Sequence, residues 1–385
     1  MCVLCRLKKQ KKEKSMLHIL KKPMQSLFKL GVLCLAAQAN AADFLPLAKD
    51  IQPNIKGLPP AFVQPVKISI CFFDMQGSTG EFYSRAKDLG LIARRWNIIA
   101  DFKVLPDEAK VAENFKAGKC DAAVLSTLHA REFNKFMGSV DAVGAIPTYE
   151  HMRLLLRTLF DPKLEPLTIS EPYQIVSVFP VGAQYLHIKD RSMETMEQLK
   201  SKKVSVINWD SSLANAMNKL GMEAVAADVG GFTKPFNTGD ADALVAPSMV
   251  YWPYELKQGL GDKGGIYSTP VVQMTASLVI NRDALKKKSP DIDSRVAAFR
   301  AMTGQFQDEM LDKIFNTIDK NEKDVPKKYW MILEPEHEQA YQEALRQTRI
   351  HLTKEGVYDV TMMKVLKKVR CKISPNAPEC SNNDE

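Results

Sequence analysis

The sequence predicts an α/β protein built from two similar lobes, with a cleft between them and extra helices at the C-terminal end. Three observations support this fold class. Short apolar, strand-like runs alternate with helical patterns, and one helix–strand unit occurs twice in the sequence. In addition, two long extended segments could cross between the lobes. Alternation of this kind typically gives parallel strands covered by helices.

The repeated unit follows the pattern Phe-x-x-Gly-x-x-Asp-Ala-x-Val and occupies residues 115–124 and 236–245. In each copy the Phe closes an apolar helical pattern, the Gly suits the left-handed turn that ends many helices, and an apolar run follows. Because ligands of open α/β sheets bind at the carboxyl ends of strands, the loops after both copies are candidate binding loops. Asp121 and Asp242 stand at the strand starts, so we interpret them as structural.

The first 41 residues read as a secretory signal peptide. A basic region precedes an apolar run over residues 30–37, and Ala39 and Ala41 give a small-x-small cleavage site. The apolar run is far shorter than the ~20 residues of a spanning helix. We therefore expect residues 1–41 to be removed and the protein to reside in the periplasm, with residues 1–15 lying upstream of the true start.

The net charge of +8 comes from this leader, which holds nine basic residues and one acidic residue. The remaining chain has 44 of each, so its net charge is about zero. This balance offers no support for binding nucleic acid or a membrane surface. We expect a monomer that does not itself span a membrane.

Four cysteines remain after the leader, an even number in an exported chain: Cys71, Cys120, Cys371 and Cys380. Four cysteines allow three pairings, and the sequence leaves them open. We favour Cys71–Cys120, which stand in two strands of one lobe that could be neighbours, and Cys371–Cys380, which would close a small loop. These four cysteines form no Cys-x-x-Cys, so we expect no metal site.

The elements of the first lobe follow one another as strand, loop and helix. The first strand is alternating and rich in β-branched and aromatic residues, and the helices carry apolar residues on one face. We expect strands at 66–73, 98–105 and 122–125 and helices at 81–95, 107–117 and 129–137.

The second lobe repeats this order and is followed by charged helices. The expected strands are 204–207, 223–227 and 243–246, with extended crossings at 172–190 and 266–280, and the expected helices are 192–200, 213–220, 283–316, 327–354 and 360–369. We assign residues 66–180 plus 281–325 to lobe 1, residues 181–280 to lobe 2, and residues 326–385 to a C-terminal helical segment.

Catalytic motifs are missing from the sequence. The six histidines are scattered, and no nucleophile elbow, phosphate-binding loop or metalloprotease motif is present. The one Gly-x-Gly-x-x-Gly, residues 259–264, follows a helix and precedes a strand, which is the reverse of the dinucleotide-binding order. We therefore predict that the protein is not an enzyme, has no catalytic residues and needs no cofactor.

Loops after the strands of the first lobe offer binding chemistry instead. Small hydroxyl residues at a helix start can hold a polar or anionic group, although ordinary N-capping would look the same. Arg131 could bind a carboxylate with two parallel hydrogen bonds, or form a structural ion pair. The candidates in this lobe are Asp74, Gln76, Ser78, Thr79, Thr127 and Arg131.

The second lobe offers a polar strand-to-helix loop and an aromatic loop. Aromatic side chains with a polar group suit ligand stacking, although Trp252 could equally pack against the core. The candidates in this lobe are Asn208, Trp209, Ser211, Ser248, Tyr251 and Trp252.

Several segments resemble periplasmic solute-binding proteins. Residues 198–206 resemble the Asp-Leu-Lys-Gly-Lys-Lys-Ile junction of the dicarboxylate-type binding proteins of TRAP transporters, and residues 220–225, 236–243 and 278–281 continue the pattern. The first-lobe segment 115–136 is similar to an offshoot family of solute-binding proteins that includes the AdeT proteins. The resemblance implies a type 2 periplasmic-binding-protein fold with a ligand in the interlobe cleft.

One departure concerns the ligand. The TRAP-type proteins carry a carboxylate-clamping Arg in the strand after the Lys-Lys-Ile junction, whereas residues 204–207 here read Val-Ser-Val-Ile. The resemblance implies that the protein captures a small polar or organic-acid ligand and delivers it to a membrane permease. The alternative is an accessory protein of antibiotic efflux or resistance that binds drug-like molecules. Direct membership of a pump is not favoured, because no run of heptads is visible.

Overall fold

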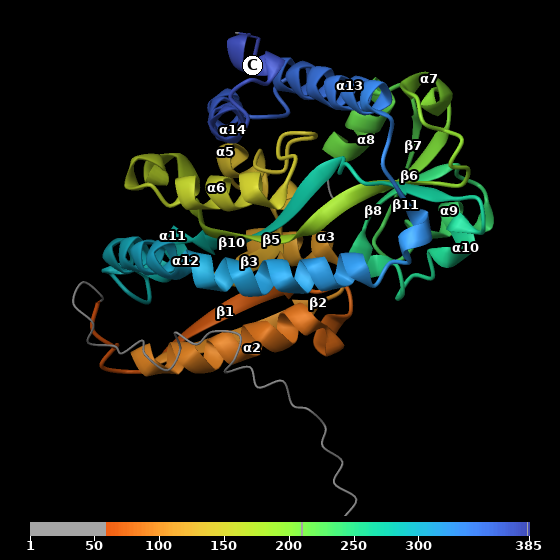
Figure 1. Cartoon of the computed structure of the whole chain (residues 1–385). Helices are drawn as coiled ribbons and strands as arrows, with labels where there is room; N and C mark the ends of the chain where they lie inside the picture. Colours follow the sequence, from red (N-terminus) through yellow and green to blue (C-terminus); the bar gives the residue numbers. More distant parts are fainter. Residues whose placement is uncertain (1–58, 209–210, 383) are drawn as a thin grey trace, which may run out of the picture. The chain divides into compact units, whose positions relative to one another are not determined.

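The computed structural model describes residues 59–208, 211–382 and 384–385 (Figure 1). The predicted signal peptide, residues 1–41, and Trp209 lie outside the described residues. The model has the mixed α/β architecture that the sequence predicts, and the two halves of its sheet correspond to the two expected α/β lobes.

One continuous sheet runs through the described chain in the order β2-β1-β3-β10-β5-β8-β6-β7. At one end β2, β1 and β3 are parallel, at the other end β8, β6 and β7 are parallel, and the antiparallel β10 and β5 join the two groups. The bounds are β1 Val66–Phe73, β2 Ile98–Leu105, β3 Ala122–Ser126, β5 Tyr173–Ile188, β6 Lys203–Ile207, β7 Glu223–Ala227, β8 Ala243–Pro247 and β10 Val272–Asn281. Short strands β4 (Ile169–Ser170), β9 (Gly265–Tyr267) and β11 (Trp330–Met331) lie off this path.

The two crossing strands change register where they pass from one half to the other. Gly182 of β5 pairs with Met274 of β10, but the next pair is Pro180 with Thr275, which leaves Val181 without an opposite residue. Gly182 has a φ of 137°, a conformation that residues with a side chain rarely adopt. This β-bulge stands at the boundary between lobes that the sequence analysis places after residue 180.

Helices cover the sheet on both sides, and most lie where the sequence predicts them. The expected helix 129–137 is two short helices, because Asn134 caps a new one by accepting the N–H of Met137. The helices are α2 Glu81–Ala93, α3 Glu108–Lys116, α4 Thr127–Ala130, α5 Lys135–Gly138, α6 Tyr149–Leu159, α7 Met196–Leu199, α8 Ser211–Lys219, α9 Lys234–Thr238, α10 Lys257–Leu260, α11 Arg282–Lys286, α12 Ile292–Lys323, α13 Pro335–Lys354 and α14 Val360–Ile373.

The long helix α12 connects the two halves of the molecule. It runs from α11 across β5 toward the loop that follows β8 (Figure 1). Its first turns pack on the first half, because Ile292 and Val296 join an apolar cluster with Val176 and Ile280. The residues just beyond its end, such as Val325, join a cluster of the second half.

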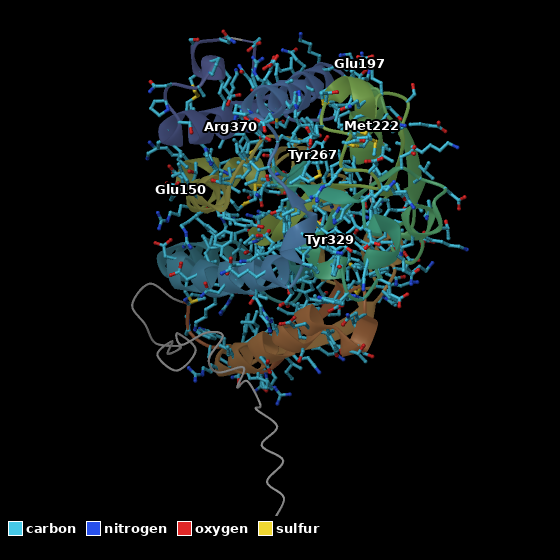
Figure 2. The ribbon with its side chains drawn as sticks, turned by 45° about the vertical axis from the view of Figure 1, so that its right-hand side comes forward. Glu150, Glu197, Met222, Tyr267, Tyr329 and Arg370 are labelled. Carbon is cyan, nitrogen blue, oxygen red and sulfur yellow. A yellow bond between two sulfur atoms is a disulfide. The ribbon has the colours of Figure 1, made fainter. Side chains whose placement is uncertain are left out.

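The C-terminal helices also contact both halves. Helix α14 packs on α5 and α6, and α13 packs on α7 and α8. Beneath them lies a buried ionic cluster in which Glu385 accepts hydrogen bonds from Arg349 and Arg370. Both arginines also donate to backbone carbonyls of the segment before α6, Arg349 to Val143 and Arg370 to Ala145. Arg370 is labelled in Figure 2, by the C-terminal helices.

Both predicted disulfides are present: Cys71–Cys120 joins β1 to the residues just before β3, and Cys371–Cys380 joins the last turn of α14 to the segment that follows it. The repeated aspartates have matching structural roles. Asp121 accepts hydrogen bonds from the backbone and hydroxyl of Ser69 on β1, and Asp242 accepts one from the backbone of Lys203 on β6. Each aspartate thus ties the start of its own strand to the neighbouring parallel strand.

Candidate ligand-binding site

The carboxyl ends of the parallel strands in both halves contribute to one apolar cluster. From the first half come Phe73 and Met75, which end β1, and Leu128, which follows β3. From the second half come Ile207 at the end of β6 and Met249 after β8. Parallel sheets bind ligands at this edge, so the meeting of the two sets of strand ends is the candidate site.

A partly buried carboxylate lies in the same region. Glu322, near the end of α12, accepts hydrogen bonds on Oε1 from the phenols of Tyr149 and Tyr185, the latter at 2.6 Å. Tyr149 begins α6 in the first half, and Tyr185 lies on the part of β5 that pairs with β8. Three segments far apart in the sequence therefore meet at one oxygen atom.

Burial sets the ionisation of these groups. It raises the pKa of the Glu322 carboxyl above its ordinary value, and the two phenol hydrogen bonds counteract that rise only in part. Burial and the neighbouring carboxylate also raise the pKa of Tyr185 well above its ordinary value. The phenols therefore remain protonated and act as hydrogen-bond donors at neutral pH.

A small cavity of about 10 Å³ adjoins Glu322. It has room for about one water molecule. Glu322 is the only charged residue among those that line it, which are Val181, Gly182, Ala183, Pro247, Ser248, Met249, Ile318, Asn321 and Glu322. The cavity lies beside the bulge of β5, between the loop after β8 and α12, with the two halves closed on each other.

Ser248 and its neighbours lie closest to this cavity among the sequence candidates. Ser248 is 7% exposed, and its hydroxyl has no hydrogen-bond partner among the described residues. Tyr251 is buried, with its ring against those of Trp252 and Tyr329. Trp252 is 61% exposed, and its indole N–H donates to the carbonyl of Asp324 just after α12.

The first-lobe loop is held by its own backbone. Asp74 is buried, and its carboxylate accepts the N–H groups of Gln76 and Tyr83. A Cβ atom at Gly80 would come within 1.9 Å of that carboxylate, so the sequence needs a glycine there. Gln76, Ser78 and Thr79 are exposed, and the Thr79 hydroxyl donates to the carbonyl of Gln76.

Thr127 and Arg131 serve the packing around β3. The Thr127 hydroxyl is fully buried and bonds that of Ser277 on β10 at 2.7 Å. The Arg131 guanidinium donates to the carbonyl of Gly138 at 3.0 Å and lies over the ring of Tyr358, 5.1 Å from its centre. These contacts direct Arg131 toward the C-terminal helices, so we do not include it in the site proposed below.

The structure describes only part of the polar loop after β6. Asn208 and Ser211 are exposed, and Trp209 between them lies outside the described residues. In the strand itself, Ser205 is buried and its hydroxyl donates to the carbonyl of Phe232. The strand in which TRAP-type proteins carry an arginine has no arginine here.

Sequence reasoning missed Tyr149, Tyr185 and Glu322. No local pattern singles out any of them, because they meet only through long-range packing. The available signal was weak: Tyr185 lies on a predicted crossing strand, and Glu322 follows the stretch 283–316 that was expected to be helical.

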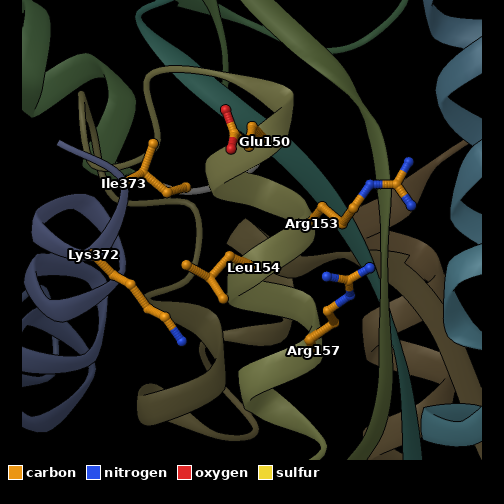
Figure 3. A pocket seen from close by; sticks show the side chains of 6 residues that line it. All are labelled: Glu150, Arg153, Leu154, Arg157, Lys372 and Ile373. Atoms are coloured by element: carbon orange, nitrogen blue, oxygen red, sulfur yellow. The ribbon is translucent and has the colours of Figure 1, made fainter.

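A larger open pocket of about 450 Å³ lies elsewhere, between α6 and the end of α14. It is lined by Glu150, Arg153, Leu154, Arg157, Lys372 and Ile373. Figure 3 shows Arg153 and Arg157 directed toward α12, away from Lys372. They are bound there by Asp312 and Asp308, so the basic groups do not converge on one point.

Within the described residues, no group of histidine, cysteine or carboxylate side chains has the arrangement of a metal site. A search of the same residues for a helix long and apolar enough to span a membrane finds none.

Solved structures with the same fold are periplasmic proteins of TRAP transporters. A TRAP periplasmic solute-binding protein from Ochrobactrum anthropi superposes with a TM-score of 0.67 at 12% identity, covering 83% of this chain and 98% of that one. The ectoine-binding protein of the TeaABC transporter from Halomonas elongata gives 0.61 at 12% identity, covering 80% and 99%. A protein from Desulfovibrio salexigens with bound orotic acid gives 0.57 at 13% identity, covering 80% and 99%. These likenesses confirm the type 2 periplasmic-binding-protein fold.

Comparison with related sequences identifies the family, whereas the solved structures show only the fold. The chain is 36% identical over 313 residues to the probable solute-binding protein AdeT1 of Acinetobacter baumannii, covering 81% of this chain and all of that protein. It is 22% identical over 244 residues to AdeT2 of the same organism, covering 63% and 98%. The family model for solute-binding protein AdeT 1/2 matches residues 90–385. This protein belongs to the AdeT 1/2 family of solute-binding proteins.

Proposed function

We propose that the protein captures a small organic solute in the periplasm, between its two halves, and delivers it to a membrane transporter. The observation that supports this proposal most strongly is the meeting of both sets of strand ends, together with Tyr149, Tyr185 and Glu322, in one interior region. The binding residues of this site are Tyr149, Tyr185, Ser248, Met249 and Glu322. Among proteins of similar fold, the Desulfovibrio salexigens protein has bound orotic acid and the Halomonas elongata protein is an ectoine-binding protein.

The cavity of about 10 Å³ is too small for such a solute. Binding therefore requires that the two halves move apart, with bending at the bulge of β5 where Gly182 lies. The predicted lobes, residues 66–180 plus 281–325 and residues 181–280, are the parts that would move.

A screen by thermal shift tests this function. The exported protein is purified from the periplasm of a host and heated with metabolites and with drug-like amphiphiles, and stabilisation should grow with ligand concentration. Stabilisation by metabolites favours a receptor for a transporter, and stabilisation by the drug-like set alone favours the accessory role in drug tolerance. If no solute of either set stabilises the protein, the proposed function is wrong.

Two variants locate the binding site. Met249→Trp places a bulky ring in the cavity and should weaken binding by about tenfold or more, because the ring occupies the space of the solute. Arg157→Gln alters the open pocket beside α6 and should leave affinity unchanged. The reverse result would assign binding to that pocket.

A further inference from the structure

One of the two carboxylate oxygens of Glu322, Oε2, accepts no hydrogen bond from the described residues. Both tyrosine phenols donate to Oε1. The described residues also place no lysine, arginine or histidine nitrogen within 4.0 Å of this carboxylate. Glu322 is partly buried, and a carboxylate that is partly withdrawn from water without a cation beside it is costly, since burial penalises the charged form. A cationic group bound beside Glu322 would therefore stabilise the charged carboxylate.

The two tyrosines that donate to this carboxylate each pack against another aromatic ring. The Tyr149 ring packs on that of Phe315 with centres 5.3 Å apart, and the Tyr185 ring packs on that of Trp330 at 4.9 Å. The faces of such rings attract cations. The one guanidinium that lies over Phe315 belongs to Arg153, which is bound to Asp312 at 2.6 Å and so is already neutralised.

Ser248 provides a second, independent sign that a ligand belongs here. Its hydroxyl is more than nine-tenths buried, has no partner among the described residues, and belongs to the lining of the cavity that Glu322 also lines. A buried hydroxyl left without a hydrogen bond lowers stability, so an incoming polar group that satisfies it would gain affinity. The remaining lining is apolar apart from Asn321.

We propose that the solute is an amphipathic organic cation, an amine or quaternary ammonium ion with an apolar body. This inference rests on the proposed function and names the ligand class of the same site. The cationic group lies against Oε2 of Glu322, a polar group of the solute meets the Ser248 hydroxyl, and the apolar body lies against Val181, Met249 and Ile318. The absence of an arginine from β6, where Ser205 is bonded to Phe232 instead, agrees with a cation rather than a carboxylate as the ligand.

Charge-matched ligands test this inference. Primary amines and quaternary ammonium ions are each compared by calorimetry with the carboxylate and the alcohol of the same body. One such set is phenethylamine, 3-phenylpropanoate and 2-phenylethanol. At neutral pH at least one cation should bind, and its carboxylate partner should bind at least about tenfold more weakly, because Glu322 repels an anion.

Variants assign the effect to Glu322. Glu322→Gln keeps an acceptor for both tyrosines and should weaken cation binding by about tenfold or more. Asp319→Asn lies one turn away on the exposed face of α12, where Asp319 pairs with Lys323, and should leave affinity unchanged. Ser248→Ala, a small change that should not disturb folding, should weaken binding only of cations that also carry a hydrogen-bonding group.

The outcomes separate this inference from the proposed function. Binding of anions or neutral solutes without any cation would overturn the cation assignment and leave the solute-binding function standing. Equal cation affinity of the Glu322→Gln variant and the wild type would do the same. If no solute of any charge binds, both proposals fall together.

Discussion

Tyr185 on β5 donates a 2.6 Å hydrogen bond to Glu322 of α12, and Tyr149 of α6 donates to the same carboxylate oxygen. This relationship joins a crossing strand, the first half of the molecule and the helix that runs between both halves. It places a partly buried carboxylate, without an ion-pair partner among the described residues, in the lining of the same small cavity as the Ser248 hydroxyl, which has no hydrogen-bond partner there either. Such an arrangement lowers the stability of the empty protein and is best explained by a bound partner.

Glu322→Gln should make the empty protein more stable at pH 8, because it removes a carboxylate that burial destabilises. In the wild type the folded pKa of Glu322 lies above its unfolded value, so the folded state binds more protons between the two values. Lowering the pH through this window should therefore stabilise the wild type relative to the variant. Urea denaturation across pH 4 to 8 measures this difference. A stability gap between the two proteins that does not change with pH would contradict it.

Removing either phenol should weaken the closed arrangement of the two halves. Tyr185→Phe should lower the free energy of unfolding by about 1–3 kcal/mol, because a hydrogen bond to a charged group is lost. The effects of Tyr149→Phe and Tyr185→Phe should not add, since both phenols serve one oxygen. A double-mutant cycle by urea denaturation gives the coupling energy. Tyr267→Phe is a matched control, because its phenol donates to the carbonyl of Met193 away from the site. It should show no coupling to Tyr185→Phe.

Gly182→Ala should destabilise β5 at its bulge, where this strand passes from one half of the sheet to the other. A side chain at a φ of 137° costs about 1–3 kcal/mol, although the added Cβ would only touch Ile318 at an ordinary 3.8 Å. Thermal unfolding measures the cost, and Gly230→Ala, where an added Cβ would lie 3.5 Å from Asp228 and the backbone is not left-handed, is the control. Equal stability of the Gly182→Ala variant and the wild type would show that the bulge relaxes freely.

The C-terminal ionic cluster should be a major source of stability. Glu385→Gln removes a carboxylate whose side chain is 2% exposed and leaves Arg349 and Arg370 with less compensation, at a cost of about 3–5 kcal/mol. Burial raises the pKa of Glu385, but the two guanidinium groups outweigh it, and the net shift is downward. Its contribution is therefore present above the unfolded pKa of about 4.3 and is lost as the pH falls through the lower folded value. Glu343→Gln, at an exposed pair with Arg346, should change stability by under about 1 kcal/mol. Similar losses in both variants, measured by urea denaturation at pH 7, would contradict this role for the cluster.

Much of the fold could be predicted from the sequence, because its elements carry local signals. The first strand, Val66–Phe73, alternates and is rich in β-branched and aromatic residues, and its bounds were predicted without error. The structural role of Asp121 followed from its place at a strand start. The expected helix 129–137 failed because Asn134 competes for the backbone as a helix cap, a local effect that apolar periodicity does not show.

The candidate site was much harder to predict, because it depends on contacts between distant segments. Ser248, which belongs to the proposed site, could be picked from the sequence because it follows a recognisable strand. Glu322 and Tyr149 are separated by 173 residues, and only the packing of α12 against α6 brings them together. Arg131 looked suited to a carboxylate ligand, but its side-chain direction depends on Tyr358 of the C-terminal segment, which no local pattern reveals.

A crystal structure with a stabilising solute tests solute capture between the two halves most directly. We predict density for the solute between the loop after β8 and α12, with its cationic group within 4 Å of Glu322, a distance typical of an ion pair. The two halves should be further apart than in the structure described above, or closed around a larger cavity. Density in the open pocket between α6 and α14, with the region around Glu322 unchanged, would contradict the proposal.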